Sequence, residues 1–466
     1  MNKETSDIVD RIIYHAHNRP DKIAFGNFSY RQVAKKMCSL SLAINGMRVL
    51  VACENREESY IGMLASLHAG ATYAPVDVSA PEARLNRILD KFRPTDIIVG
   101  LKDQDRFETV HRVGSECRIS RQVVSDLPAY VIFTSGSTGE PKGVVISRKA
   151  LNHFLKWSAS DLGISHNSRI SQHPNVAFDL SVLDIYTGLY NGAQIFPIQS
   201  SIDKMFPGRC IQRNKLTHWI SVPSVVDLIA KDVSIKHNDF ATLEKMIFCG
   251  EPLLPRHLEY IYNLNEKLIV FNTYGPTEAT VCMTKLELTS KDWRSKINGS
   301  VALGDAIPGM EIELKDGRDN SEGEIIISGG QIAEGYWLQP ELTNKVFVDN
   351  KYHTGDWAEI IDGEIYFKSR IDRQVKVHGN RVELGDIEQC IYDLTKKATA
   401  CIKHQDRIIA YIEGSEINQT ELLNKILENT VEYMRPYKII CLNDLPRNIN
   451  DKIDYNSLAA LAEEEV

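Results

Sequence analysis

The sequence predicts an α/β protein with a large N-terminal domain of βαβ-layered sheets and a small α+β C-terminal domain. Short apolar runs alternate with amphipathic stretches through most of the chain, which is typical of parallel strands covered by helices on both faces. Hairpin patterns replace this alternation from residue 311 onward, and a polar strand and a helix follow residue 370. The 466 residues also exceed one ordinary core, because domains usually hold about 100–200 residues.

The expected elements follow in order along the chain. The first buried strand is predicted at 48–53, and the next stretch places Ile61, Leu64, Ala65 and His68 on one helical face. Further buried strands are expected at 96–100, 129–134, 216–222, 245–249 and 268–274. Two hairpins, over 311–329 and 359–370, predict a small β-barrel-like subdomain. The domain boundary is expected between 1–370 and 371–466.

Composition excludes several functional classes. Lys and Arg number 54 against 62 Asp and Glu, so the net charge is −8. A nucleic-acid coat needs excess positive charge to displace counterions, and no nucleic-acid partner is expected. The nine cysteines are scattered without any C-x-x-C, which predicts neither a disulfide framework nor a zinc module. The N-terminus lacks a signal-peptide core and no run reaches about 18 apolar residues, so we expect a cytoplasmic protein without a membrane span.

The most informative local pattern is the segment 130–144, YVIFTSGSTGEPKGV. An apolar strand runs into a loop dense in glycines and hydroxyl side chains, with Lys142 near its end. Glycine lets backbone N–H groups approach a phosphate, and the hydroxyls and the lysine add donors and positive charge. Lys142 follows Pro141 and precedes Gly143, so the G-K-[ST] ending of a P-loop NTPase is missing. We predict a phosphate-binding loop of another design, with an ordinary Gly/Ser loop as the alternative.

The order TSGSTGEPKG after an apolar strand resembles the signature of adenylate-forming enzymes. This superfamily includes acyl-CoA synthetases, luciferases and the adenylation domains of peptide synthetases. Matching motifs follow in order: AGATYAPVDV (69–78), NTYGPTEATV (272–281), GEIIISG (323–329), YHTGDW (352–357), RIDRQVKVHGNRVELGDIE (370–388) and LPRNINDKIDY (445–455). The resemblance therefore covers residues 20–456, nearly the whole chain.

The resemblance implies a reaction in two steps with ATP and Mg²⁺ as cofactors. A carboxylate attacks the α-phosphate of ATP to form an acyl-adenylate, and a thiol then takes the acyl group. Catalysis is expected to rest on positioning and charge stabilisation. Lys452, Thr277 and Glu278 would be catalytic, with Glu278 holding the metal through oxygen. The ATP-binding residues implied are Thr134, Ser135, Gly136, Ser137, Thr138, Gly139 and Lys142 at the phosphates, Gly250, Glu251, Pro252, Asn272, Thr273 and Tyr274 near adenine and the α-phosphate, and Asp356 and Arg370 at the ribose.

The resemblance also implies a mobile C-terminal domain and a protein partner. Asp372 occupies the hinge position, about which the domain would rotate between the two steps, withdrawing Lys452 and bringing Gly379 to the thiol. No carrier module follows in the chain, so the acceptor would be the phosphopantetheine thiol of a carrier protein supplied in trans. Because carrier proteins are generally acidic, Arg373, Lys376 and Arg381 are expected contacts.

The stretch FDLSV (178–182) indicates the class of acid. Amino-acid-activating members place an aspartate here, and Asp179 would pair with the substrate's α-ammonium; a helix N-cap aspartate is the alternative. Uncharged and non-aromatic residues are expected to line the side-chain pocket: Leu180, Leu183, Ser224, Ile247, Cys249, Thr273, Val281 and Cys282. Such a pocket rejects charged side chains through uncompensated desolvation. The segments FDLSVLDIY and IFCGEPL are similar to stand-alone ligases that load D-alanine onto a carrier protein, so a small uncharged amino acid, with alanine first, is the expected substrate.

Two departures and three alternatives accompany this prediction. The family usually has glycine where Asp451 stands and, among amino-acid-activating members, an aromatic residue where Asn380 stands. The first alternative is a stand-alone peptide-synthetase adenylation enzyme for proline, serine or another small amino acid. The second is an acyl- or aryl-CoA ligase in which Asp179 is only a cap. The third is a degenerate member that binds nucleotide without catalysis.

Overall fold

The structure is a computed structural model that describes residues 7–54, 56–103, 106–111, 128–134, 140–237, 239–317, 321–377, 379–414, 417–447 and 453–465. For 101–103, 106–111 and 464–465 it describes the backbone. The chain divides into two compact units. The first comprises Met1–Val78, Phe92–Ile132 and Gly143–Ser369, and the second comprises Ser79–Lys91, Phe133–Lys142 and Arg370–Val466. No helix in the described part of the chain is long and apolar enough to cross a membrane.

The largest sheet has nine strands in the order β17-β14-β13-β12-β11-β9-β10-β1-β2. Strands β9 to β13 are parallel, as the alternating pattern predicts, and β14 returns antiparallel to β13. Their bounds are β1 (Ile23–Phe25), β2 (Phe28–Ser29), β9 (Arg169–Gln172), β10 (Gln194–Pro197), β11 (His218–Ser221), β12 (Lys245–Phe248), β13 (Ile269–Tyr274), β14 (Thr284–Leu288) and β17 (Asp305–Ala306).

A second sheet has seven strands in the order β20-β8-β7-β4-β3-β5-β6. It contains the predicted strands at 48–53, 96–100 and 129–134, each shifted by at most a few residues at its ends. Their bounds are β3 (Arg48–Val51), β4 (Thr72–Pro75), β5 (Asp96–Asp103), β6 (Arg106–His111), β7 (Pro128–Thr134), β8 (Lys142–Ser147) and β20 (Gly335–Tyr336). The predicted strand before the phosphate loop is therefore confirmed.

An antiparallel sheet of five strands occupies the region where the hairpins are predicted. It contains β18 (Met310–Lys315), β19 (Glu322–Gly329), β21 (Phe347–Val348), β22 (Lys351–Ile361) and β23 (Glu364–Arg370), and the short pair β15 (Ile297–Asn298) and β16 (Ser300–Val301) precedes it. Both predicted hairpins are confirmed, because β18 pairs with β19 and β22 pairs with β23.

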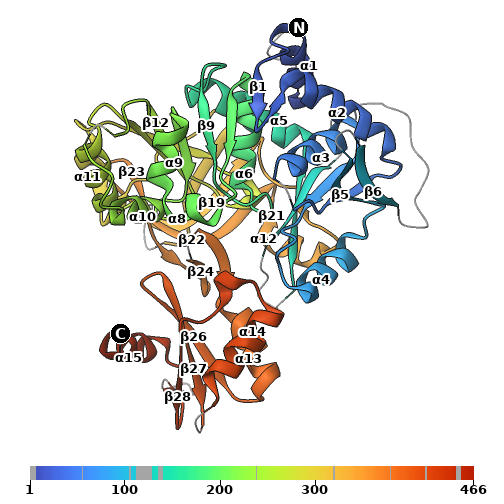
Figure 1. The fold of residues 1–466 in the computed structure, drawn as a ribbon. Coiled ribbons are helices and arrows are strands. Elements are labelled where there is room, and N and C mark those ends of the chain that lie inside the picture. Colours follow the sequence, from blue (N-terminus) through green and yellow to red (C-terminus); the bar gives the residue numbers. More distant parts are fainter. Residues whose placement is uncertain are drawn as a thin grey trace. The chain divides into compact units, whose positions relative to one another are not determined.

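Helices pack around these sheets, and α1, α2 and α3 lie side by side (Figure 1). Helix α2 shows how local sequence sets a start: Ser29 and Gln32 form a capping box, each side chain bonded to the other's backbone. The bounds are α1 (Ile8–Asn18), α2 (Tyr30–Ala43), α3 (Arg56–His68), α4 (Glu82–Phe92), α5 (Arg148–Asp161), α6 (Leu180–Val182), the π-turn η1 (Leu183–Thr187), α7 (Gly188–Asn191), α8 (Ser201–Met205), α9 (Pro207–Asn214), α10 (Val225–Lys231), α11 (Pro255–Leu264), α12 (Pro340–Val346), and the 3-10 turns η2 (Thr277–Ala279) and η3 (Trp293–Lys296).

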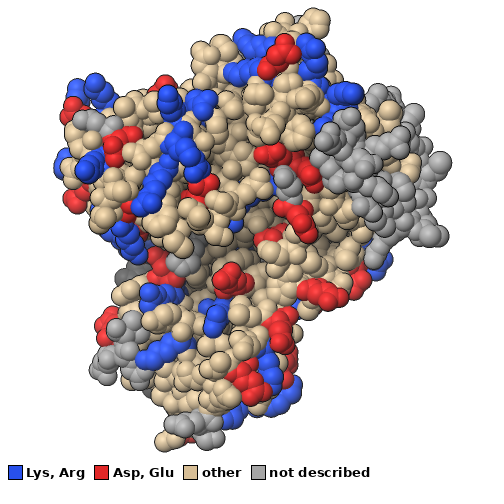
Figure 2. Space-filling view, viewed as in Figure 1, with Lys and Arg blue, Asp and Glu red and all other residues tan. Residues whose placement is uncertain are grey.

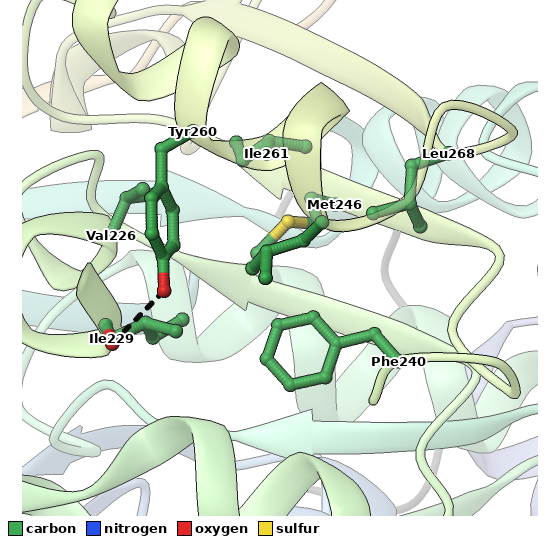
Figure 3. A pocket seen from close by; sticks show the side chains of 8 residues that line it. Val226, Ile229, Phe240, Met246, Tyr260, Ile261 and Leu268 are labelled. Carbon is green, nitrogen blue, oxygen red and sulfur yellow. Dashed lines mark hydrogen bonds between the residues drawn. The ribbon is translucent and has the colours of Figure 1, made fainter. Parts of the chain in front are cut away.

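One well-packed apolar cluster lies where α10 and α11 cover β12. Val226, Ile229, Phe240 and Met246 close on one another there, and the remaining gap is too narrow for a water molecule (Figure 3). Tyr260 reaches over the cluster and donates a hydrogen bond from its hydroxyl to the Ile229 carbonyl at 3.2 Å. We interpret this cluster as a rigid support for the strands that carry the candidate site.

The second unit has its own apolar core, in which α13 and α14 pack against a three-stranded sheet. Its elements are β24 (Gln374–Val377), β25 (Asn380–Glu383), α13 (Leu384–Thr395), β26 (Thr399–His404), β27 (Arg407–Glu413), α14 (Gln419–Asn429), η4 (Glu432–Met434), β28 (Lys438–Leu442) and α15 (Tyr455–Glu465). Over the face in Figure 2, basic and acidic side chains are interspersed, in keeping with the nearly balanced composition.

Candidate active site

The carboxyl ends of β12 and β13 bring two sequence motifs together. The strands are parallel, with Phe248 opposite Asn272, so Cys249 and Gly250 follow one strand beside Thr273 and Tyr274 on the other. The hydroxyl of Thr273 donates to the Phe248 carbonyl at 2.9 Å and locks the two ends to each other. Ligands in open α/β sheets bind at this edge, where side chains from neighbouring strands converge.

Tyr274 and Asp356 meet although 82 residues separate them in the chain. The Tyr274 hydroxyl donates to Asp356 Oδ2 at 2.6 Å, a short bond to a charged acceptor. Asp356 is buried in β22, and its backbone N–H donates to the Thr354 hydroxyl at 3.0 Å. The residues predicted to contact adenine and ribose therefore lie side by side.

Glu278 is completely buried at the turn η2, which begins at the half-buried Thr277. Its Oε1 accepts a hydrogen bond from the Tyr336 hydroxyl at 2.7 Å, and its backbone carbonyl accepts from the Ala333 N–H at 2.8 Å. Sequence reasoning did not identify Tyr336. The only signal is a tyrosine after the glycine-containing run 328–335, and no local pattern shows that it reaches Glu278.

The backbone turns sharply directly after Glu278. Thr280 and Val281 both have left-handed backbones, with φ of +56° and +76°. Each such conformation of a β-branched residue costs about 1–3 kcal/mol and persists only where its surroundings hold it. A Cβ at Gly275 would lie 2.5 Å from the Cα of Cys282, so the turn folds back closely enough to require glycine there.

The residues predicted to line the amino-acid pocket are mostly buried and uncharged. Those with almost no exposed surface are Leu180, Leu183, Ile247, Cys249, Thr273, Val281 and Cys282, and Ser224 is half-buried. A hydrogen bond to Cys249 and burial raise the pKa of the Cys282 thiol well above its usual value, and the charge of Asp179 adds to this shift. The thiols of Cys249 and Cys282 and the Asp179 carboxylate are therefore neighbours.

Asp179 precedes the short helix α6 and has helical backbone angles, φ −63° and ψ −27°. Its side chain makes no capping hydrogen bond there, whereas an N-cap aspartate has an extended backbone and accepts from the first turn. The cap alternative therefore lacks the bond that defines it.

Several predicted ATP-binding residues make contacts within the protein. The Asn272 amide donates to the Ala302 carbonyl at 2.7 Å, and Glu251 Oε2 accepts from the Ser224 N–H at 3.0 Å. Gly250 has a φ of +100°, and Pro252 is exposed. The first two side chains thus stabilise the strand ends and the start of α10.

In the second unit, the phosphate-loop lysine is paired with an acidic residue. Lys142 Nζ lies 3.1 Å from Glu383 Oε1, with both side chains nearly buried, and the Gln374 amide donates to the same oxygen at 2.6 Å. The Thr134 hydroxyl donates to the Lys142 carbonyl at 3.4 Å. Ser135, Gly136, Ser137, Thr138 and Gly139 lie outside the described residues, as do Asp451 and Lys452.

The predicted ribose contact Arg370 and the predicted hinge Asp372 form a bidentate ion pair. Arg370 Nε and Nη2 donate to the two Asp372 carboxylate oxygens at 2.7 and 2.6 Å. Burial opposes ionisation of this carboxyl, but the guanidinium lowers the pKa of Asp372 below its ordinary value. The Gln374 N–H also donates to Asp372 Oδ1 at 3.1 Å, so Asp372 organises the entry into β24.

Comparison with known proteins places this geometry in a family. Residues 13–337 match the profile described as AMP-binding enzyme. A D-alanine--D-alanyl carrier protein ligase of Lactococcus lactis subsp. lactis (strain IL1403) is 31% identical, with 97% of this chain and 98% of that protein covered. The chain belongs to the AMP-binding enzyme family.

Further AMP-binding enzymes resemble the chain over nearly its whole length. The ligase of the same name from Bacillus velezensis is 31% identical, over 96% of this chain and 98% of that protein. Two solved structures share the fold: the Vibrio cholerae adenylation domain AlmE with glycyl-adenosine-5'-phosphate, at TM-score 0.83 and 22% identity over 98% and 97% of the chains, and the Bacillus subtilis o-succinylbenzoate CoA synthetase MenE, at TM-score 0.80 and 18% identity over 97% and 98%. The predicted superfamily and fold class are confirmed, and the protein is an AMP-forming ligase. AMP-binding enzymes of this kind use ATP.

Proposed function

We propose that the protein activates a small uncharged amino acid, with D-alanine as the first candidate, and transfers it to a carrier protein. ATP would supply the adenylate, and the phosphopantetheine thiol of a carrier protein supplied in trans would accept the aminoacyl group. Relatives at about 30% identity over nearly the full chain are named D-alanine--D-alanyl carrier protein ligases, which supports this choice.

The observation that carries the substrate class is the Asp179 carboxylate beside a buried, uncharged group of side chains. A desolvated ammonium needs a partner charge, and Asp179 supplies one without serving as a helix cap. The buried thiols and aliphatic residues offer no partner to a charged substrate side chain, and a small side chain leaves few unfilled contacts.

Mg²⁺ is the metal that we propose for Glu278. This buried carboxylate already has one oxygen held by Tyr336, and Mg²⁺ commonly takes one or two protein carboxylates together with substrate phosphates. Bound there, the ion would neutralise phosphate charge.

Residues 371–466 are proposed to act as a mobile domain that pivots at Asp372 and carries Lys452. The ion pair with Arg370 and the hydrogen bond from Gln374 make Asp372 the point at which chain direction is set. Lys452 would stabilise charge during adenylate formation and then withdraw.

ATP–pyrophosphate exchange with both enantiomers of alanine, serine, proline, valine and threonine tests the proposed first step. We expect the fastest exchange with a small uncharged amino acid and none with its decarboxylated amine. Exchange with fatty or aromatic acids and with no amino acid would contradict the proposal and favour a CoA ligase.

A further inference from the structure

Gln331 is a completely buried polar side chain whose contacts converge on the left-handed turn after Glu278. Its Nε2 donates two hydrogen bonds, to the Ala279 carbonyl at 3.0 Å and to the Cys282 carbonyl at 2.9 Å. These two carbonyls flank Thr280 and Val281. One amide group therefore spans the two residues whose backbones are left-handed.

The backbone of Gln331 and its remaining amide atom are also engaged. The Thr280 hydroxyl donates to the Gln331 carbonyl at 2.6 Å, and His153 Nδ1 lies 3.2 Å from Gln331 Oε1. The nearby Ala333 N–H donates to the Glu278 carbonyl. The segment that begins at Gln331 thus holds the turn from both ends and in the middle.

The turn connects both halves of the candidate site. Glu278, which is proposed to bind Mg²⁺, precedes the two left-handed residues, while Val281 and Cys282 belong to the proposed amino-acid pocket. Because a buried carbonyl without a donor is costly, loss of the Gln331 amide would let the turn relax toward a less demanding backbone. Relaxation would displace the pocket residues that follow it.

We propose that Gln331 is a positioning residue that fixes the Ala279–Cys282 turn and thereby sets the shape of the amino-acid pocket. The assignment of the pocket rests on the proposed function. Gln331 itself touches no reacting atom in this account, since it acts through the backbone of the turn. Its loss should therefore change affinity and selectivity for the amino acid more than affinity for ATP.

Two variants and one control test this proposal in the full-length protein. Gln331→Met keeps the side-chain length and removes both donors, whereas Gln331→Glu keeps the shape and regains one donor only when protonated. Tyr30→Phe is the control, because it removes another buried bond to a backbone carbonyl, Tyr30 to Ala193 at 2.7 Å, far along the chain from the turn. Exchange kinetics with alanine and valine, ATP binding in the absence of amino acid and thermal unfolding are measured for each.

We expect Gln331→Met to raise the alanine KM by about ten-fold or more and to reduce the preference for alanine over valine. ATP affinity should change by less than about two-fold. The KM defect of Gln331→Glu should shrink as the pH falls from about 8.5 to about 6.5, each value taken relative to the unmodified protein at the same pH so that titration of His153 cancels. Tyr30→Phe should lower only the unfolding temperature.

Kinetics and selectivity of Gln331→Met within about two-fold of the unmodified protein would overturn the proposal, as would equal kinetic losses in Tyr30→Phe. Failure of the proposed function gives a different result: the unmodified protein would then exchange another class of acid. The same comparison of KM between variants would be made with that acid.

Discussion

At the scale of single residues, Asp179 and Lys142 are the charged side chains on which the account depends most. Asp179 lies beside two buried thiols and makes no capping bond, so its charge is available to an ammonium group. Lys142 is nearly buried against Glu383, so its charge is already balanced within the protein. Each arrangement predicts the effect of removing one carboxylate.

Asp179→Asn should lower kcat/KM for the amino acid by about 30-fold or more, because removing one partner of a desolvated charge pair costs about 2–5 kcal/mol. ATP affinity should stay unchanged. Pyrophosphate exchange and calorimetric ATP titration measure the two effects. Asp21→Asn is a suitable control, since Asp21 forms only an exposed ion pair with Arg31 at 3.5 Å. Equal kcat/KM values in Asp179→Asn and the control would contradict amine recognition by this residue.

Glu383→Gln should tighten ATP binding by about three- to ten-fold, because the ammonium of Lys142 would no longer be shared with a carboxylate when phosphates arrive. Lys142→Met should weaken binding, and the double variant should resemble Lys142→Met alone. Calorimetric titration with ATP measures all three. Weaker ATP binding in Glu383→Gln would show that Glu383 orients Lys142 for phosphate and does not compete with it.

At the scale of elements, the site depends on where strands and helices begin and end. Parallel pairing of β12 and β13 places their carboxyl ends together, and the left-handed turn after η2 returns the chain to the same edge. Helix starts are set by local polar side chains that satisfy the first N–H groups. Such local devices contribute to stability without entering the chemistry.

Ser29→Ala should lower the free energy of unfolding by about 1 kcal/mol, because it removes one half of the capping box of α2. Urea unfolding measures this change, and Ser29→Thr, which keeps the hydroxyl, should cost less. Exchange kinetics should be unaltered in both. A loss of exchange activity in folded Ser29→Ala would contradict a purely structural role for this cap.

At the scale of the whole molecule, the first unit buries histidines that must be neutral. His218 on β11 is completely buried beside the Thr217 hydroxyl, and burial and the charge of Lys245 lower its pKa from 6.5 to about 4. Burial likewise lowers the pKa of His15 to about 4. The unfolded chain binds these protons more readily than the folded chain, so acid favours unfolding.

The free energy of unfolding should therefore fall as the pH drops from about 6.5 toward about 4, and this contribution should level off below the folded pKa. The contribution of His218 should be on the order of 1 kcal/mol or more over that range. Urea titrations at several pH values, with His218→Gln as the comparison, measure it. Equal pH slopes in the two proteins would contradict the neutral, buried state of His218.

Much of this fold could be predicted from the sequence because its signals are local. The apolar runs that became β3, β7 and β13 and the hairpins β18–β19 and β22–β23 stand out by residue type alone. Contacts between distant residues could not be predicted in this way. The bond from Tyr336 to Glu278, the two bonds from Gln331 and the pairing of Lys142 with Glu383 join residues 49 to 241 positions apart. Only the folded chain shows them.

The central claim is that the protein loads a small amino acid onto a carrier protein. The most direct test incubates it with ATP, Mg²⁺, D-alanine and a phosphopantetheine-bearing carrier protein, and then measures the intact mass of the carrier. We predict a gain of one alanyl group that hydroxylamine removes and that does not form on the carrier without its phosphopantetheine arm. An unmodified carrier, together with an acyl group transferred only to coenzyme A, would contradict the claim.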